Sequence, residues 1–335
     1  MYARRYAVSL SVLAALVGSA VSAEAHGMIG ERFLPATLAT DDPFVADELS
    51  LPTVFSILTP ASGESPRTKF TSLSGEFSKR LSPNLGLSLS GAWDVLAPQG
   101  RPDDDNTKVL TGFENMEINL KYVFFKLPKH ELLLSAGLSW EVGGTGSKKV
   151  GADSFDTFTP TLYFGKGMGD LPDALEWLKP IAVTGVLGWA VPNRVRTQTI
   201  STDEDTGEVT VEREFNPTVF QWGFSTQYSL PYLQSFVRDI GLPAPFNRMI
   251  PLVEVSLQTP IDGPKAGHTT GYVFPGVIWS GRYMQVGIEA VIPINQLTGK
   301  NVGVLAQLHF YLDDIAPKIF TWTPFSGTLG PTQPR

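Results

Sequence analysis

The sequence predicts an all-β protein, a transmembrane antiparallel β-barrel of about 12 strands (10–14) with short periplasmic helices. Three observations lead to this fold class. Long segments alternate apolar and polar residues, no apolar run after residue 25 is long enough for a transmembrane helix, and short connections alternate with long ones. A closed barrel is the other structure that satisfies every backbone polar group in lipid.

Residues 131–142 show the alternation most clearly. Leu134, Leu138 and Trp140 share one face of the expected strand, and Ser135 and Glu141 share the other. Such a length is about twice that of an ordinary strand, whereas about 9–11 tilted residues cross a bilayer in a barrel. This segment is therefore expected to span a membrane.

Similar segments recur along the chain, and their number is even, as in bacterial single-chain barrels. Pro160 and Pro275 lie inside two of them and lack the donor that a strand ladder needs, which suggests bulges or misplaced strands. The expected strands are 52–58, 67–80, 85–96, 112–125, 131–143, 154–165, 180–191, 217–229, 250–259, 270–280, 283–293 and 301–312.

The connections predict which ends of the strands lie together. Short turns at 82–84, 127–130 and 280–282 interleave with longer polar loops at 97–110, 144–153, 193–216, 260–269 and 294–300. Barrels have short periplasmic turns and longer outer loops. The inner connections 166–179 and 230–248 have helical patterns, and the outer segment 202–214 alternates as a hairpin would.

The two ends of the chain are expected to lie outside the barrel domain. Residues 1–25 predict a signal peptide, with Arg4 and Arg5 before an apolar stretch and cleavage after Ala23 or Ala25. An anchor helix fits less well, because that stretch is shorter than a membrane span requires. We therefore expect a periplasmic leader (26–51), the barrel (52–312) and a periplasmic tail (313–335), with the acidic segment 41–48 as a solvated linker.

Charge and composition exclude several functions. Removing residues 1–25 leaves 24 basic and 32 acidic side chains, which argues against a nucleic-acid partner. The chain has no cysteine, so neither disulfides nor cysteine metal sites can form.

Catalytic and cofactor motifs are also missing. There is no G-x-S-x-G, phosphate-loop or H-E-x-x-H motif, so we expect neither an enzyme nor a cofactor. The one weak metal candidate is His26, which cleavage after Ala25 would make the amino terminus.

Assigning the apolar face of each strand to lipid leaves a polar lumen. Its acidic excess favours cations or neutral solutes over anions. The alternative is that these acids pair with basic side chains or lie in bulk water at the strand ends. Glu76 belongs to a poorly phased strand, and the other expected lumen residues are Asp94, Asn115, Glu117, Asn119, Lys121, Glu141, Gln221, Gln227, Glu254, Gln258, Gln285, Glu289, Gln307 and His309.

Aromatic residues give an independent sign of a membrane. They sort by height into two groups, as rings at the two lipid–water boundaries do. The expected outer girdle is Trp93, Trp140, Trp189 and Trp222, and the expected inner girdle includes Tyr122, Tyr228 and Trp279.

The last expected strand, 301–312, has Gly303 followed by alternating apolar residues that end near Phe310. It resembles the closing strand of outer-membrane barrels, although 23 residues follow it here. The chain as a whole resembles Gram-negative outer-membrane β-barrels, loosely the transporter-like barrels of the MetA-type phenol-degradation group. The resemblance implies export to the outer membrane, contact with its lipid and passive passage of small solutes.

Two alternatives to a channel remain at this stage. The barrel could be a scaffold or sheath for a periplasmic or lumen-threaded partner protein, or a structural barrel plugged by its own helices or ends. The pattern of the strands does not distinguish them.

Overall fold

The computed structural model describes residues 27–61, 66–99, 108–202 and 209–325. It is a closed antiparallel barrel with twelve strand positions. At one of these positions the chain forms two consecutive short strands, β6 and β7, which both pair with β5. The last strand pairs with the first across the closing seam, with Val304 opposite Ser56. The strands are β3 (Glu48–Thr59), β4 (Thr68–Ser82), β5 (Leu85–Pro98), β6 (Leu110–Phe113), β7 (Met116–Leu127), β8 (Leu132–Val142), β9 (Thr157–Gly167), β10 (Ile181–Pro192), β13 (Val219–Tyr228), β14 (Met249–Pro260), β15 (Thr270–Ser280), β16 (Met284–Pro293) and β17 (Gly303–Tyr311).

The alternation predicted from the sequence produces two faces in each strand. In β8, Leu138 and Trp140 point outward and are 49% and 39% exposed, whereas Ser135 points inward and is fully buried. Because neighbouring strands are in register, their apolar residues together form the outer surface of the barrel. The predicted fold class and strand number are confirmed.

Two details differ from the prediction. The first barrel strand begins at Glu48, four residues before the expected start. Pro160 and Pro275 pair with Leu138 and Val253 on one side of their strands, and on the other side the pairing is interrupted at each proline without a shift of register. The expectation of bulges or misplaced strands there was therefore wrong.

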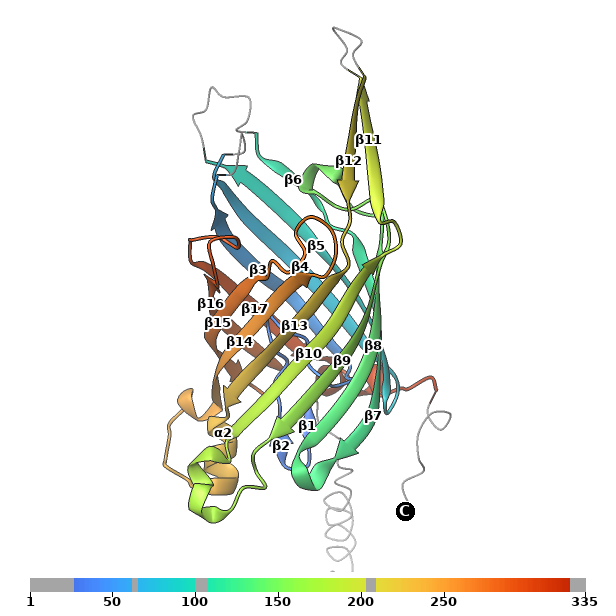
Figure 1. Cartoon of the computed structure of the whole chain (residues 1–335). Coiled ribbons are helices and arrows are strands. Elements are labelled where there is room, and N and C mark those ends of the chain that lie inside the picture. The colour runs from blue at the N-terminus through green and yellow to red at the C-terminus, as the bar shows by residue number, and fades with distance from the viewer. Residues whose placement is uncertain (1–26, 62–65, 100–107, 203–208, 326–335) are drawn as a thin grey trace, which may run out of the picture.

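Short turns and long loops lie at opposite ends of the barrel, here called the turn end and the loop end (Figure 1). The hairpin of β11 (Arg196–Thr202) and β12 (Val209–Phe215) rises from the loop end. At the turn end, the two long connections form the predicted short helices η4 (Asp173–Leu178), α2 (Leu230–Tyr232), η5 (Leu233–Val237) and η6 (Phe246–Arg248). None of the helices in the described ranges is long and apolar enough to cross a membrane.

The leader enters the barrel instead of remaining a solvated linker. A small hairpin of β1 (Met28–Ile29) and β2 (Arg32–Phe33) lies at the turn end (Figure 1), and residues 34–46 then fold into the lumen. We call residues 27–47 the plug segment. Its apolar residues contact the inward glycines of the wall, since a Cβ atom added to Gly287 would lie 2.5 Å from Leu38.

The tail packs against the base of the barrel through α3 (Leu312–Ile315) and α4 (Pro317–Phe320). The rings of Phe320 and Phe77 meet edge to face at 6.4 Å, and the Phe325 amide donates to the Leu81 carbonyl over 2.7 Å. The described part of the tail therefore packs against β4 at the turn end of the barrel.

Gly271, at the start of β15, occupies a position that only glycine can fill without strain. Its φ is +143°, and an added Cβ atom would lie 2.2 Å from the Ser256 carbonyl oxygen. We expect Gly271→Ala to lower the free energy of unfolding by about 1–3 kcal/mol. Urea unfolding of refolded protein measures this, with Gly91→Ala as the matched control because no atom lies within 4 Å of a Cβ there. Equal stability of the two variants would contradict the prediction.

Candidate functional site

The plug segment is anchored at the turn end by a buried ion pair. Arg32 is fully buried, and its Nε donates to Glu131 Oε2 over 3.0 Å while Nη1 donates to the Pro180 carbonyl over 2.9 Å. Its guanidinium also lies 3.6 Å from the centre of the Tyr232 ring. The sequence assigned no role to Arg32, which lies in a leader without periodic pattern.

Tyr232 completes this cluster from the helical connection α2. Its hydroxyl donates to Glu131 Oε1 over 3.0 Å, and the Gly169 amide donates to Glu131 Oε2 over 3.0 Å. Burial and the adjacent carboxylate raise the pKa of Tyr232 to about 12, so the hydroxyl stays protonated and remains a donor. Both long inner connections therefore help to hold the plug segment.

Glu254, on β14, holds the tip of the plug segment inside the lumen. Its carboxylate accepts from the amides of Leu38, Ala39 and Thr40 over 2.8, 3.2 and 2.7 Å, and from the Thr40 hydroxyl over 2.7 Å. Successive backbone amides converging on one anion form a strong site for negative charge. Glu254 was predicted to line the lumen, and the structure places it on the inner wall but covers it completely.

A second wall contact comes from β7. Lys121 Nζ lies 2.7 Å from both Asp41 Oδ1 and the Asp42 carbonyl oxygen, and 4.5 Å from the centre of the Tyr163 ring. Burial raises the pKa of Asp42 to about 7, and the Lys121 charge opposes part of that rise. The Asp41 carboxylate therefore neutralises the one cation that was predicted in the lumen.

The end of the plug segment is fixed where it joins the barrel. Asp47 is fully buried and accepts from Lys79 Nζ over 2.6 Å and Arg80 Nε over 2.7 Å. Arg80 also contacts Asp313 of the tail at 2.8 Å. The expectation that residues 41–48 form a solvated linker was therefore wrong, because Asp41 and Asp47 pair with cations of the barrel wall that lie far away in the sequence.

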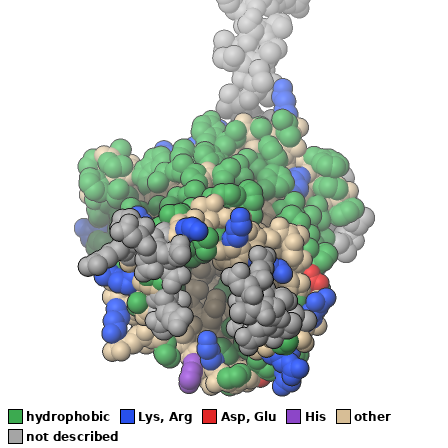
Figure 2. Space-filling model, turned by 90° about the horizontal axis from the view of Figure 1, so that it is seen from above, with side chains coloured by type: hydrophobic (Ala, Val, Ile, Leu, Met, Phe, Trp, Pro, Cys, Tyr) green, Lys and Arg blue, Asp and Glu red, His purple; other side chains and the backbone are tan. Residues whose placement is uncertain are grey.

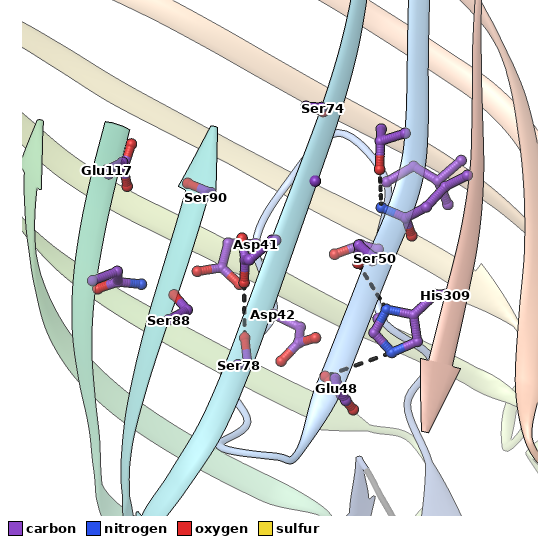
Figure 3. A pocket seen from close by; sticks show the side chains of 18 of the residues that line it. Asp41, Asp42, Glu48, Ser50, Ser74, Ser78, Ser88, Ser90, Glu117 and His309 are labelled. Atoms are coloured by element: carbon purple, nitrogen blue, oxygen red, sulfur yellow. Dashed lines mark hydrogen bonds and ion pairs between the residues drawn. The ribbon is translucent and has the colours of Figure 1, made fainter. Parts of the chain in front are cut away.

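The described residues of the lumen enclose two neighbouring cavities, among others, of about 400 and 380 Å³. They share the plug residues 39–41 and the wall residues Glu76, Ser88, Ser90, Glu117 and Asn119, so they form one continuous space. Seen from the loop end, the surface is hollowed at its centre (Figure 2). Figure 3 shows the serine and acidic side chains that converge on the first cavity.

The lining of these cavities is acidic. Seven carboxylates lie among the described lining residues, against Lys121 as the one lysine or arginine. Most of the other polar lining side chains are serines and threonines, which interleave with the acids along the strands. These carboxylates are Asp41, Asp42, Glu48, Glu76, Glu114, Glu117 and Glu141.

The structure divides the residues that were predicted to line the lumen into two groups. Those that border a cavity are Asn115, Glu117, Asn119, Lys121, Glu141, Gln221, Gln258, Gln307 and His309. Those that border neither cavity, and are at most 2% exposed, are Asp94, Gln227, Glu254, Gln285 and Glu289. Gln285 is covered by the plug segment, since its Nε2 donates to the Ala36 carbonyl over 2.6 Å.

In the part of the chain that the structure describes, the histidines do not gather into a metal site. His309 contacts Ser50 through Nδ1 at 2.9 Å and Glu48 through Nε2 at 3.6 Å, whereas His130 pairs with Asp170 at the turn end. Among the described ranges, no group of three or more histidine, aspartate and glutamate side chains could hold a metal ion. His26 lies outside the described residues.

Several aromatic residues contact one another in pairs across neighbouring strands toward the loop end. The rings of Trp93 and Phe113 are 4.6 Å apart, those of Trp189 and Phe220 are 5.2 Å apart, and Trp140 stacks on Phe158 at 6.1 Å. Trp222 follows Phe220 by two residues on the same face of β13. Toward the turn end lie Tyr122, Tyr228 and Trp279. Their role as membrane girdles remains a prediction.

No protein-family model and no curated protein matches this chain. Among solved structures it is similar to an outer membrane channel from Pseudomonas putida F1, with a TM-score of 0.49, 12% identity, and coverage of 83% of this chain and 99% of that one. It is also similar to the KdgM and NanC porins, both with a TM-score of 0.42, at 11% and 8% identity and covering 78% of this chain and 98% of each. These similarities are too distant to transfer a residue's role from one chain to another.

Proposed function

We propose that this chain is an outer-membrane channel for small polar solutes, in which cations and uncharged molecules are favoured over anions. The observation that carries the proposal is the continuous, acidic, hydroxyl-lined space above the plug segment. An apolar outer surface around a polar interior suits a barrel that holds water inside a membrane. The plug segment is then the constriction that limits which solutes pass.

Conductance of refolded full-length protein in planar bilayers tests this proposal. We expect discrete single-channel steps in KCl, and under a KCl gradient a zero-current potential of the sign that a cation-preferring pore gives. Glu76→Gln/Glu117→Gln/Glu141→Gln should move that potential toward zero, because it removes three lumen charges. Glu31→Gln, at an exposed position in the leader, should leave it unchanged.

Two outcomes would count against the channel. Silence that persists after removal of residues 27–46 and after removal of 313–335 would leave a structural barrel, for which the plug segment inside the lumen is the supporting observation. If the protein conducts but the triple substitution leaves its zero-current potential unchanged, these carboxylates do not determine its preference for cations.

A scaffold for a periplasmic protein is the second candidate. The observation that favours it is the exposed apolar surface of the tail, where Ile319 and Trp322 are 67% and 66% exposed. Under this hypothesis, a partner co-purifies with the full chain and is lost when residues 313–335 are deleted. Its loss would have to occur without any change in barrel folding.

A further inference from the structure

Three glutamates of the lumen lie in one row that crosses four neighbouring strands. Glu76 on β4 is opposite Ser90 on β5, Ser90 is opposite Glu117 on β7, and Glu117 is opposite Glu141 on β8. We call the three glutamates, together with Ser90 between Glu76 and Glu117, the carboxylate row. Ser90 and Glu117 are labelled in Figure 3, where both project into the cavity.

The register gives the row a defined spacing. Neighbouring strands lie about 4.8 Å apart, so Glu117 and Glu141 are roughly 5 Å apart along the wall, and Glu76 and Glu117 are roughly twice that. All three glutamates line the cavities and none is fully buried, so a solute in the lumen can reach them.

The pairing of Glu117 with Glu141 is unfavourable for the barrel alone. Like charges directly opposite each other on antiparallel strands destabilise a sheet. The nearby ammonium of Lys121 does not relieve this repulsion, because the plug segment supplies its two acceptors, the Asp41 carboxylate and the Asp42 carbonyl. A cationic ligand would relieve it.

An independent observation also indicates a ligand that donates hydrogen bonds. Asn119 follows Glu117 by two residues on the same face of β7, borders both cavities, and is 8% exposed. Its side-chain carbonyl oxygen accepts no hydrogen bond within the described structure. A buried acceptor without a donor is unfavourable, and a primary or secondary ammonium group would supply that donor.

We propose that the carboxylate row and Asn119 form a binding site for linear polyamines. This inference rests on the proposed function, since the channel would bring the ligand to the site. A linear polyamine carries ammonium groups separated by short methylene spacers, on the same scale as the spacing of the row. Ser90 and the serines beside it accept hydrogen bonds from groups that lie between two carboxylates.

Calorimetric titration of the detergent-solubilised full chain with spermidine tests binding without requiring conduction. We expect Glu117→Gln and Glu141→Gln each to weaken spermidine binding by about tenfold, as loss of one charge-assisted hydrogen bond does. Glu31→Gln is the matched control and should bind as the wild type does. n-Butylamine, with a single charge, should bind at least tenfold more weakly than 1,4-diaminobutane.

A stability readout separates loss of the site from loss of folding. Because Glu117→Gln removes a like-charge pair, it should raise the thermal midpoint of the ligand-free protein while it weakens spermidine binding. A misfolded variant would instead show a lower thermal midpoint together with weaker spermidine binding. Glu117→Asp, which keeps the charge, should bind spermidine within a few fold of the wild type.

The outcomes also distinguish this inference from the proposed function. Spermidine binding that depends on the row in a protein that never conducts would support the site and overturn the channel. Conduction without spermidine binding, or with binding that Glu117→Gln and Glu141→Gln leave intact, would overturn the site and leave the channel standing.

Discussion

Replacing Glu254 by alanine is expected to release the tip of the plug segment and to raise the potassium conductance of the refolded protein severalfold. The Glu254 carboxylate accepts four hydrogen bonds from residues 38–40, and alanine would leave these donors without their acceptor. Each such buried donor costs about 1–3 kcal/mol. Because about 1.4 kcal/mol changes an equilibrium tenfold, the docked state would lose its dominance.

Two comparisons define the scale of this effect. A chain that lacks residues 27–46 gives the potassium conductance of the barrel without its plug segment. Glu254→Gln keeps one acceptor oxygen, so its conductance should lie between that of this shortened chain and that of the wild type. Limited proteolysis from the turn end reports release of the plug directly. Wild-type conductance in Glu254→Ala, together with a plug that stays protected from protease, would refute the prediction.

Replacing Arg32 by alanine is expected to cost about 3–5 kcal/mol of plug docking, as breaking a buried ion pair does. The loss would leave the buried carboxylate of Glu131 without its cation, and the Pro180 carbonyl would keep only the Ser229 amide as a donor. The readout is the urea concentration at which protease first cuts the plug segment, with Arg238→Ala as the matched control. Arg238 is an exposed arginine at the same end of the barrel, near the Trp177 ring, so its loss should cost less than about 1 kcal/mol.

A double substitution tests the physical reason for the Arg32 effect. Arg32→Ala/Glu131→Ala removes both charges, so it should cost less than the sum of the two single substitutions. If the costs simply added, the ion pair would not be what anchors the hairpin.

The barrel could be predicted from the sequence because the alternation of apolar and polar residues within each strand shows which of its faces is apolar. In residues 131–142, the period of two alone separates Leu138 and Trp140 from Ser135 and Glu141, whatever the partner strands are. Register also follows from local turns, since the turn at 82–84 places Ser78 opposite Ser88. Pro160 and Pro275 misled the prediction, because a proline ring can occupy a ladder position whose missing donor does not shift the register.

The plug segment could not be predicted, because the contacts that hold it span the sequence. Leu38 and Glu254 are 216 residues apart, and Arg32 and Glu131 are 99 residues apart. Neither contact has a local pattern, and Asp41 and Asp42 have the composition of a solvated linker. The same contacts determine which predicted lumen residues remain accessible, since Glu254 and Gln285 face inward but are covered.

The place where the plug segment joins the wall sets an order of assembly. Asp47 leads directly into β3, which forms the seam with β17, while the plug reaches across the interior to β8 and β14. Those distant strands must be in place before the plug can find its acceptors. While the sheet is still open at the seam, the plug segment can reach the interior through that opening. Once the barrel has closed, the plug segment can enter only through the turn end. Residues 27–46, although they precede every strand of the barrel wall in the sequence, are therefore expected to be among the last to reach their native contacts.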